Sequence, residues 1–454
     1  MTSAAPGARS GGALPENRDV WRIALPMILS NLTVPLLGMT DTGVTGHLGS
    51  EVYLAAVAIG ATIFSVLYTG VNFLRMGTTG IAAQSYGAHD YVKLRTSLGQ
   101  AVVVALLIAS TLLLVHRPLG AFAVELIGAD SEIRRIALEY FNIRIWSAPG
   151  TLINYALIGW FLGTQNARVP LLMFLTINFT NIVLDLVLVL GFGMKVDGVA
   201  LASVVAEYAG LTVGAACLVG TLEKHPGHWR LDRLTRIRRY GRFFSVNANL
   251  FVRTLALMFA LTFMTAQGAR LGATILAANA LLMNLQNLTA FALDGIAHAA
   301  EALVGKAVGA RRRDALVRAV LLTLRWSVGF ATALALAYVL LGPLLIRLLT
   351  DLDDVRATAL RYLPWLIASP LISVWSFLYD GVFVGATRAK EMRNIMLLAA
   401  VVFLVTWVLA KSFGNHGLWF AFMVFLGVRG IGMHFYYRYR ILPTVGATAT
   451  SRMV

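Results

Sequence analysis

Residues 170–193 read PLLMFLTINFTNIVLDLVLVLGFG, a run of 24 residues that contains a single charge, Asp185. A helix needs about 20 mostly apolar residues to cross the hydrocarbon core of a bilayer. Similar runs recur along the whole 454-residue chain, which is 58% hydrophobic and 13% charged, with mean hydropathy +0.73. Soluble domains carry about 25% charged residues, so soluble enzymes, nucleic-acid-binding proteins and disordered scaffolds fit poorly. The sequence predicts an all-α polytopic membrane protein.

Twelve spans of this kind can be drawn, six before and six after a polar loop. They cover residues 20–46, 52–83, 96–116, 134–163, 170–193, 197–220, 241–266, 272–305, 318–341, 357–386, 392–412 and 415–437. The sequence therefore predicts five parts: an N-terminal tail (1–19), an N-lobe (20–220), a linker loop (221–240), a C-lobe (241–437) and a C-terminal tail (438–454).

The basic residues are divided unevenly between the two sides of these spans. Loops on the side of the N-terminal tail hold 24 Lys and Arg, the opposite loops hold 8, and six fall within spans. Cytoplasmic loops are enriched in Lys and Arg, so we expect both termini and the linker loop to be cytoplasmic. The net charge of +16 is then explained by basic residues in cytoplasmic loops and does not require a nucleic-acid partner. With one cysteine, Cys217, neither an internal disulfide nor a thiolate metal cluster is expected.

The two halves of the chain repeat each other at one constant offset, with position n matching position n + 222. The segment GWFLG at 159–163 matches GVFVG at 381–385, and Leu-Ala-Ala at 54–56 matches the same triplet at 276–278. Six spans per half is an even number, so the halves run parallel and are related by an axis along the membrane normal. We expect two six-helix lobes that form a V around a central cavity, an architecture typical of transporters.

Acidic residues inside the N-terminal spans are the main candidates for function, because a charge in hydrocarbon is costly. Asp41 follows the helix-kinking Pro26 and Pro35 in the first span. Asn178, Asn181 and Asp185 share one face of the fifth span, and Ser203 and Glu207 share one face of the sixth. Burial raises the pKa of a carboxyl, so such a site can hold and release a proton. The alternative is that these acids only cap or hydrogen-bond kinked helices.

The second half does not repeat these acids but has its own charges. Arg253 is a candidate partner for Asp380 or Asp294, since buried charges are usually paired. The sequence contains no Walker A motif, no HExxH and no GxSxG with a plausible triad. We therefore expect neither an enzyme nor a bound cofactor.

Five segments resemble the MATE family of multidrug and toxic-compound extrusion transporters, in the branch of DNA-damage-inducible F (DinF-like) proteins. They are WRIALPMILSNLTVPLLGMTDTGVTGHLG (21–49), FLRMGTTGIAAQSYGA (73–88), NFTNIVLDLVLVLGFGMKVDGVALASVVAEY (178–208), LDGIAHAAEALVGKAVGARRR (293–313) and YDGVFVGATRAKEMRN (379–394). The resemblance implies proton or sodium coupling at Asp41 and Asp185. It assigns supporting positions to Asn181, Ser203 and Asn154, and the kink to Pro26. Sodium-coupled members also carry a seventh-span glutamate, whereas residues 243–266 contain Arg253 and no acid.

We therefore expect a monomeric antiporter of the bacterial inner membrane that exports organic, often cationic, compounds in exchange for H⁺, with Na⁺ as the second candidate. Its partners would be small organic molecules and membrane lipids. One alternative is a lipid-linked sugar flippase, which shares the two-lobe architecture but needs basic residues for a pyrophosphate. An integral-membrane enzyme is the alternative from another class.

Overall fold

The computed structural model describes residues 13–46, 50–230, 232, 234, 236 and 240–446, and the side chains of residues 34–37, 39, 41 and 42 lie outside the described part. Within these ranges every regular element is helical, which confirms the all-α fold class. The elements are α1 (Asn17–Gly46), α2 (Glu51–Val71), α3 (Phe73–Gly87), α4 (Tyr91–Leu114), α5 (His116–Ile127), α6 (Ser131–Arg144), η1 (Ile145–Ser147), α7 (Ala148–Gly163), α8 (Arg168–Asp185), η2 (Leu186–Gly191), α9 (Val196–Glu223), α11 (Gly241–Arg270), α12 (Ala273–Gly309), α13 (Arg313–Leu349), α14 (Asp353–Gly385), α15 (Ala389–Ala410), η4 (Lys411–Phe413), α16 (Asn415–Tyr436), η5 (Tyr437–Ile441) and η6 (Leu442–Thr444).

Ten helical segments of the described chain are long and apolar enough to cross a membrane. They correspond to ten of the twelve spans expected from the sequence. The other two spans, 20–46 and 134–163, are helical as α1 and as α6–η1–α7 but are not among these ten. The sequence did not predict α5, a helix of 12 residues. It ends at Gly128 in the left-handed conformation, and Gly120 on it lies against the Phe141 ring.

The internal repeat is visible in the helix ends. Helices α2, α3, α4, α6 and α7 begin or end at positions 51, 87, 91, 131 and 163, and helices of the second half do so at the equivalent positions 273, 309, 313, 353 and 385. Four non-glycine residues of the described chain have positive φ, and they form two pairs at the same offset: His89 with Arg311, and Gln165 with Thr387. The duplication therefore extends to the caps of corresponding helices.

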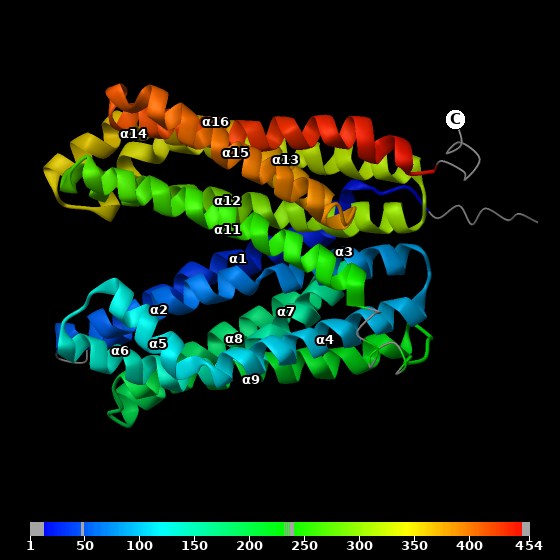
Figure 1. Cartoon of the computed structure of the whole chain (residues 1–454), viewed down its shortest axis with the longest axis horizontal. Helices are drawn as coiled ribbons and strands as arrows, with labels where there is room; N and C mark the ends of the chain where they lie inside the picture. Colours follow the sequence, from blue (N-terminus) through cyan, green and yellow to red (C-terminus); the bar gives the residue numbers. More distant parts are fainter. Residues whose placement is uncertain are drawn as a thin grey trace, which may run out of the picture.

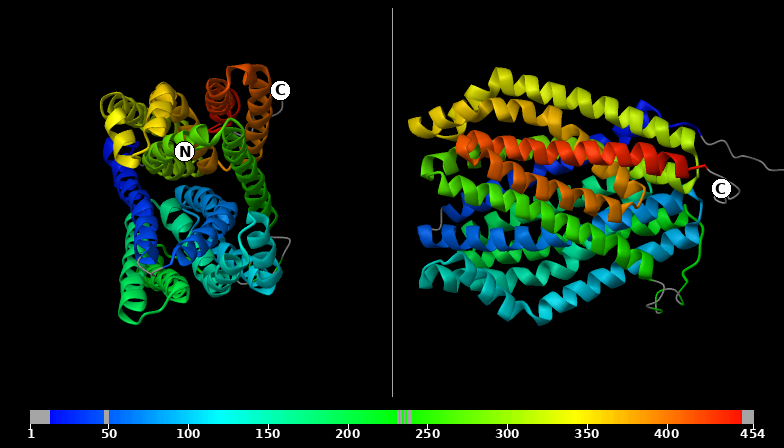
Figure 2. Two further views of the ribbon diagram at one scale, coloured as in Figure 1. Left: turned by 90° about the vertical axis from the view of Figure 1, so that its left-hand side faces the viewer. Right: turned by 45° about the horizontal axis from the view of Figure 1, so that its top comes forward.

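The helices form two stacks, which Figure 1 shows below (α2 to α9) and above (α12 to α16) the middle of the molecule. Helices α1 and α11 pass between the stacks on opposite sides, as the left view of Figure 2 shows. The first half of α1 contacts α12 through Ile28, which lies against Gly295, and its second half contacts α8 through Thr33 and Asn178. Each lobe is thus tied to the other by one long helix.

The two stacks touch closely at the end where α3 and α12 finish. A Cβ atom built on Gly87 would lie 2.0 Å from the carbonyl oxygen of Lys306, and one built on Gly309 would lie 2.0 Å from that of Gln84. These contacts are related by the internal repeat, so they lie symmetrically about the axis between the lobes. Only glycine leaves room for backbones to approach this closely. The structure is therefore closed at this end, where the described part of the C-terminal helix also finishes (Figure 1).

The repeated GxFxG segments explain how each lobe holds its own helices together. A Cβ on Gly159 would lie 2.4 Å from the Arg75 carbonyl oxygen of α3, and a Cβ on Gly381 would lie 2.3 Å from the Ala297 carbonyl oxygen of α12. Helix α7 therefore packs on α3 as α14 packs on α12. The lobe boundaries drawn from the sequence remain a prediction.

Candidate coupling and substrate site

The polar face of α8 is buried against α1 and α9 in the first stack. Asn178, Asn181 and Asp185 are 8%, 1% and 0% exposed, as expected for three residues spaced along one helical face. Asn178 donates a hydrogen bond to the Thr33 hydroxyl of α1. Asn181 donates to the Ser203 hydroxyl of α9 at 3.3 Å. One helix therefore brings polar groups from three helices into one buried cluster.

Asp185 lies where the helix changes its geometry. Helix α8 ends at this residue and a π-helical turn, η2, follows directly. Single π turns inside longer helices occur frequently at functional sites, because the extra residue redirects the backbone. The carboxylate of Asp185 thus lies in the protein interior at a point where the chain is locally irregular.

A second polar pair lies one turn further along α9. The Asn154 amide of α7 donates to the Glu207 carboxylate at 2.9 Å and to the Glu207 main-chain carbonyl at 2.9 Å. The sequence placed Ser203 and Glu207 on one face of the sixth span, and the structure gives them different partners. Helix α9 therefore joins the Asn181–Ser203 contact to the Asn154–Glu207 contact.

Helix α1 supplies the remaining residues predicted for the N-lobe. It runs without interruption through Pro26 and Pro35, and the Ser30 hydroxyl donates to the Pro26 carbonyl oxygen at 2.8 Å. The side chains of Asp41 and Pro35 lie outside the described residues. The backbone of Asp41 lies on α1, the helix that also brings Thr33 to Asn178.

The second stack contains a buried ionic cluster around Asp380 of α14. The Arg253 guanidinium of α11 donates to Oδ2 of Asp380, and Arg429 of α16 donates to the same oxygen at 2.8 Å. The three side chains are at most 12% exposed. The predicted pairing of Arg253 with Asp380 is thus present. Asp294 of α12, the other candidate partner, is half-buried and makes no hydrogen bond or ion pair within the described ranges.

A third ionic group crosses between the stacks. Arg75 of α3 forms a 3.3 Å ion pair with Glu301 of α12, and both side chains are nearly buried. His298 Nδ1 lies 3.4 Å from both the Arg75 guanidinium and the Glu301 carboxylate. The three groups thus join α3 of the first stack to α12 of the second.

Sequence reasoning gave no role to Arg429 or to the Arg75–Glu301 pair. Arg429 carried one available signal, because it is an arginine inside a predicted span and such residues are usually paired. The identity of its partner depends on packing between α14 and α16, which one helix's residue spacing cannot give.

Comparison with known proteins agrees with this architecture. The MatE family model matches residues 26–187 and 250–409. DNA damage-inducible protein F of Escherichia coli K12 is 42% identical over 417 residues, which is 92% of this chain and 91% of that protein. The probable multidrug resistance protein NorM of Rhizobium meliloti is 26% identical over 94% of this chain and 93% of its own length. A crystal structure of MATE in the straight conformation aligns with TM-score 0.86 at 19% identity, over 95% of this chain and 97% of that chain.

At 19% identity the solved structure shows the fold alone. The family model and the Escherichia coli relative match most of the sequence and therefore show the family. The matched ranges of the family model lie in both halves of the repeat and include Asp185 and Asp380. Together they confirm the family that the five motif segments predicted: the chain is a multi-pass membrane protein of the MatE family, a transporter of the DinF-like branch and not an enzyme.

Proposed function

We propose that the protein is a secondary active antiporter that exports small organic compounds, including cations, in exchange for H⁺ by alternating access. The observation that carries this proposal is the buried cluster in the N-lobe, where Asp185, Asn178, Asn181 and Ser203 meet from α8 and α9. A carboxylate away from water is costly unless it is protonated or partnered. The carboxyl group of Asp185 in this cluster is therefore suited to bind a proton at one stage and a cationic ligand at another.

The coupling site comprises Asp41 and Asp185, with Asn154, Glu207 and the amides of α8 in supporting positions. A ligand changes the balance between two conformations only by binding them with different affinity. An ionised carboxylate favours a cationic substrate, and a protonated one does not. Proton binding and substrate binding therefore oppose each other reciprocally, which is the thermodynamic requirement for exchange.

The charges of the C-lobe favour H⁺ over Na⁺ as the coupling ion. Na⁺ binds to oxygen ligands, and a carboxylate that no arginine or lysine engages is one such ligand. Asp380 is engaged by both Arg253 and Arg429, and Glu301, a second buried acid of this lobe, is paired with Arg75. Two guanidinium groups repel a metal cation from the same oxygen. We assign this cluster a structural role, with ion coupling confined to the N-lobe.

We place the protein in the bacterial inner membrane as a monomer with both termini in the cytoplasm. The excess of Lys and Arg on the side of the termini supports this orientation. The contact of α3 with α12 through Gly87 and Gly309 then closes the cytoplasmic end. In this orientation, access between α3 and α12 from the cytoplasm is blocked by these backbone contacts.

A flippase for lipid-linked sugars is less well supported by the central charges. Such a protein needs unneutralised basic groups for a pyrophosphate. Arg75 is paired with Glu301, and Arg253 and Arg429 share Asp380. Each of these three arginines is thus bound to a carboxylate, which leaves little positive charge there for a phosphorylated substrate.

Transport by purified protein in liposomes tests the proposal. A fluorescent organic cation such as ethidium is followed while a pH gradient or a Na⁺ gradient is imposed separately. We expect the pH gradient to drive transport by the wild type, Asp185→Asn to fall to the rate of protein-free liposomes, and Asp351→Asn, an exposed loop acid, to match the wild type.

Two outcomes would contradict parts of this proposal. Transport driven by the Na⁺ gradient alone would overturn the assignment of H⁺. Full pH-driven transport by Asp185→Asn would remove this carboxylate from the coupling site. Folding of each variant is checked by its elution in gel filtration, so that loss of transport is not confused with loss of protein.

A further inference from the structure

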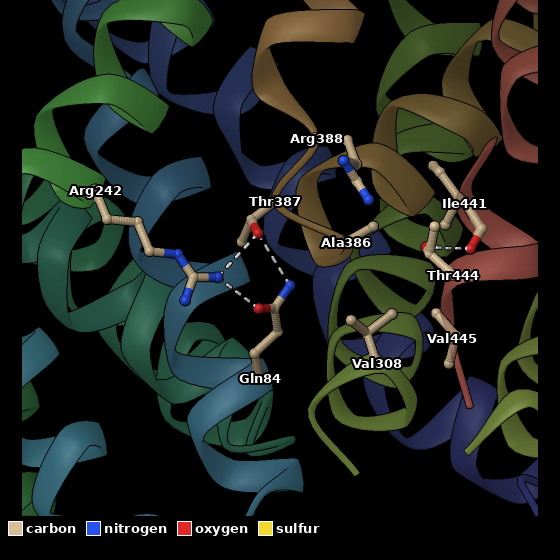
Figure 3. A pocket seen from close by; sticks show the side chains of 9 residues that line it. All are labelled: Gln84, Arg242, Val308, Ala386, Thr387, Arg388, Ile441, Thr444 and Val445. Atoms are coloured by element: carbon tan, nitrogen blue, oxygen red, sulfur yellow. Dashed lines mark hydrogen bonds between the residues drawn. The ribbon is translucent and has the colours of Figure 1, made fainter. Parts of the chain in front are cut away.

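A pocket of about 260 Å³ lies where the two lobes meet, at the end where α3 and α12 finish, and Figure 3 shows it from close by. Its lining comes from both lobes: Gln84, Arg242, Val308, Ala386, Thr387, Arg388, Ile441, Thr444 and Val445. Pockets for drug-sized ligands range from about 300 to 1,000 Å³. This pocket is therefore too small for a typical transported drug but has room for a small polar group.

The polar side of the pocket is a hydrogen-bonded cluster centred on Arg242. The Arg242 guanidinium donates to the Gln84 amide oxygen at 2.7 Å and to the Thr387 hydroxyl at 3.1 Å. Gln84 in turn donates to the Thr387 hydroxyl at 3.1 Å and to the Gly385 carbonyl at 3.0 Å. Figure 3 shows these three side chains converging on one side of the pocket, with Arg388 above them. The arrangement places Arg242 at a fixed point of the lobe interface.

The charge of Arg242 is not neutralised within the described part of the chain. Its hydrogen-bond acceptors are neutral, and no carboxylate lies within ion-pair distance of it there. Arg388 contacts Glu391 at 3.5 Å while its side chain remains 38% exposed. Arg242 also lines a second pocket of about 260 Å³, together with Lys93, Thr96 and Ser97. The region therefore combines cationic groups with hydroxyl donors, the set that phosphate oxygens prefer.

The internal repeat shows that the two guanidinium groups are not repeated in the other half of the chain. The positions equivalent to Arg242 and Arg388 in the other half are Val20 and Asn166. The lobes nevertheless meet there as closely, with Lys306 donating to the Gln165 side chain at 3.1 Å. The two guanidinium groups are thus specific to one of the two related contacts, where Arg242 both joins the lobes through Gln84 and brings positive charge to the pocket.

We propose that this pocket binds an anionic phosphate group, supplied by a lipid headgroup or by phosphate in solution. Arg242 and Arg388 provide the charge, and Thr387 provides a hydroxyl. On the opposite side, Val308, Ile441 and Val445 form an apolar surface suited to the glycerol region of a lipid. Basic pockets between membrane helices on the cytoplasmic side are typical headgroup sites. Because the ligand touches both lobes, it stabilises the arrangement in which they are in contact.

The experiment measures ligand binding to the purified full chain in detergent, and it needs no transport. Dioctanoyl phosphatidylglycerol is titrated by isothermal calorimetry, with dioctanoyl phosphatidylcholine as the zwitterionic control and inorganic phosphate as a competitor. Arg242→Gln should weaken phosphatidylglycerol binding by at least about tenfold, the scale of one charge-assisted hydrogen bond. Arg270→Gln, at the other end of the same helix α11, should bind as the wild type does.

The arms of the experiment separate the sources of the phosphate. Competition by inorganic phosphate supports a site that accepts phosphate from solution as well as from lipid, whereas Arg242-dependent lipid binding without competition supports a lipid headgroup alone. Equal affinity of the wild type and Arg242→Gln would overturn the proposal, and so would equal loss in Arg270→Gln. If Arg242→Gln elutes as aggregate, Arg388→Gln is used, and unchanged affinity in that variant refutes the site.

Discussion

The glycine contacts between the lobes predict how the conformational equilibrium can be shifted. Replacing Gly87 and Gly309 with alanine places each new Cβ 2.0 Å from a carbonyl oxygen of the opposite lobe, while ordinary contact begins at 3.4 Å. The backbones must move apart to restore an ordinary contact, because the obstructing atoms belong to the main chain and no side chain can rotate away. We therefore expect the double variant to separate the lobes at this end.

The magnitude follows from overpacking, which costs about 1–3 kcal/mol at each site. The higher helix propensity of alanine does not enter, because α3 and α12 are helical in both arrangements of the lobes. The cost to the closed state for both sites is therefore about 2–6 kcal/mol. At about 1.4 kcal/mol per tenfold, the equilibrium should move toward the open state by roughly one to four powers of ten.

Distances between spin labels can measure this shift. Labels at Ala88 and Ala310, exposed positions related by the repeat, are introduced into a Cys217→Ser background and measured by pulsed electron paramagnetic resonance. The double variant should show a longer distance population. Gly329→Ala, where a built Cβ meets no atom within 4 Å, should leave the distribution unchanged. An unchanged distribution in the double variant, with wild-type thermal stability, would refute the tight contact between the lobes.

Two further predictions concern the C-lobe cluster and the topology. Asp380→Asn leaves two arginines buried without their carboxylate and should lower the free energy of unfolding by about 3–5 kcal/mol. Arg429→Gln leaves one complete pair and should lower it by about 1.5–3 kcal/mol. Thermal unfolding in detergent should therefore show the larger loss for Asp380→Asn, and the reverse order would contradict the cluster. In intact spheroplasts without Cys217, a cysteine at Asp351 should react with an impermeant thiol reagent and one at His228 should not, and the opposite result would invert the proposed orientation.

Much of the fold was predictable because membrane helices carry strong local signals. The length of an apolar run set the spans, and the constant offset read from GWFLG and GVFVG recurs in helix ends and caps. The spacing of Asn178, Asn181 and Asp185 also placed them correctly on one buried face. These features depend on residues within one helix or on comparison of one half with the other, and both are available in the sequence.

Contacts between helices were less predictable, because they depend on how the helices pack. Nothing in the sequence indicated that Arg429 would join Arg253 on one carboxylate oxygen, or that Glu207 would receive the amide of Asn154. The crossing of α1 and α11 between the stacks was likewise not foreseen. The sequence also did not predict α5, since a helix of 12 residues is too short to span a bilayer, or the division of the span 52–83 into α2 and α3.

The repeat also separates what the two lobes share from what each must do. Symmetric features lie where the lobes touch: the glycines at 87 and 309 and the positive-φ caps that pair at the same offset. Asymmetric features are the charged groups: Asp185 has no acidic counterpart, because position 407 is Trp, and Arg253 corresponds to Asn31. A movement that opens one end and closes the other requires matching contacts in both halves, whereas coupling to one kind of ion requires one kind of site. Duplication supplies the matching contacts in both halves. Later divergence of the interior charges accounts for an ion site in one half alone.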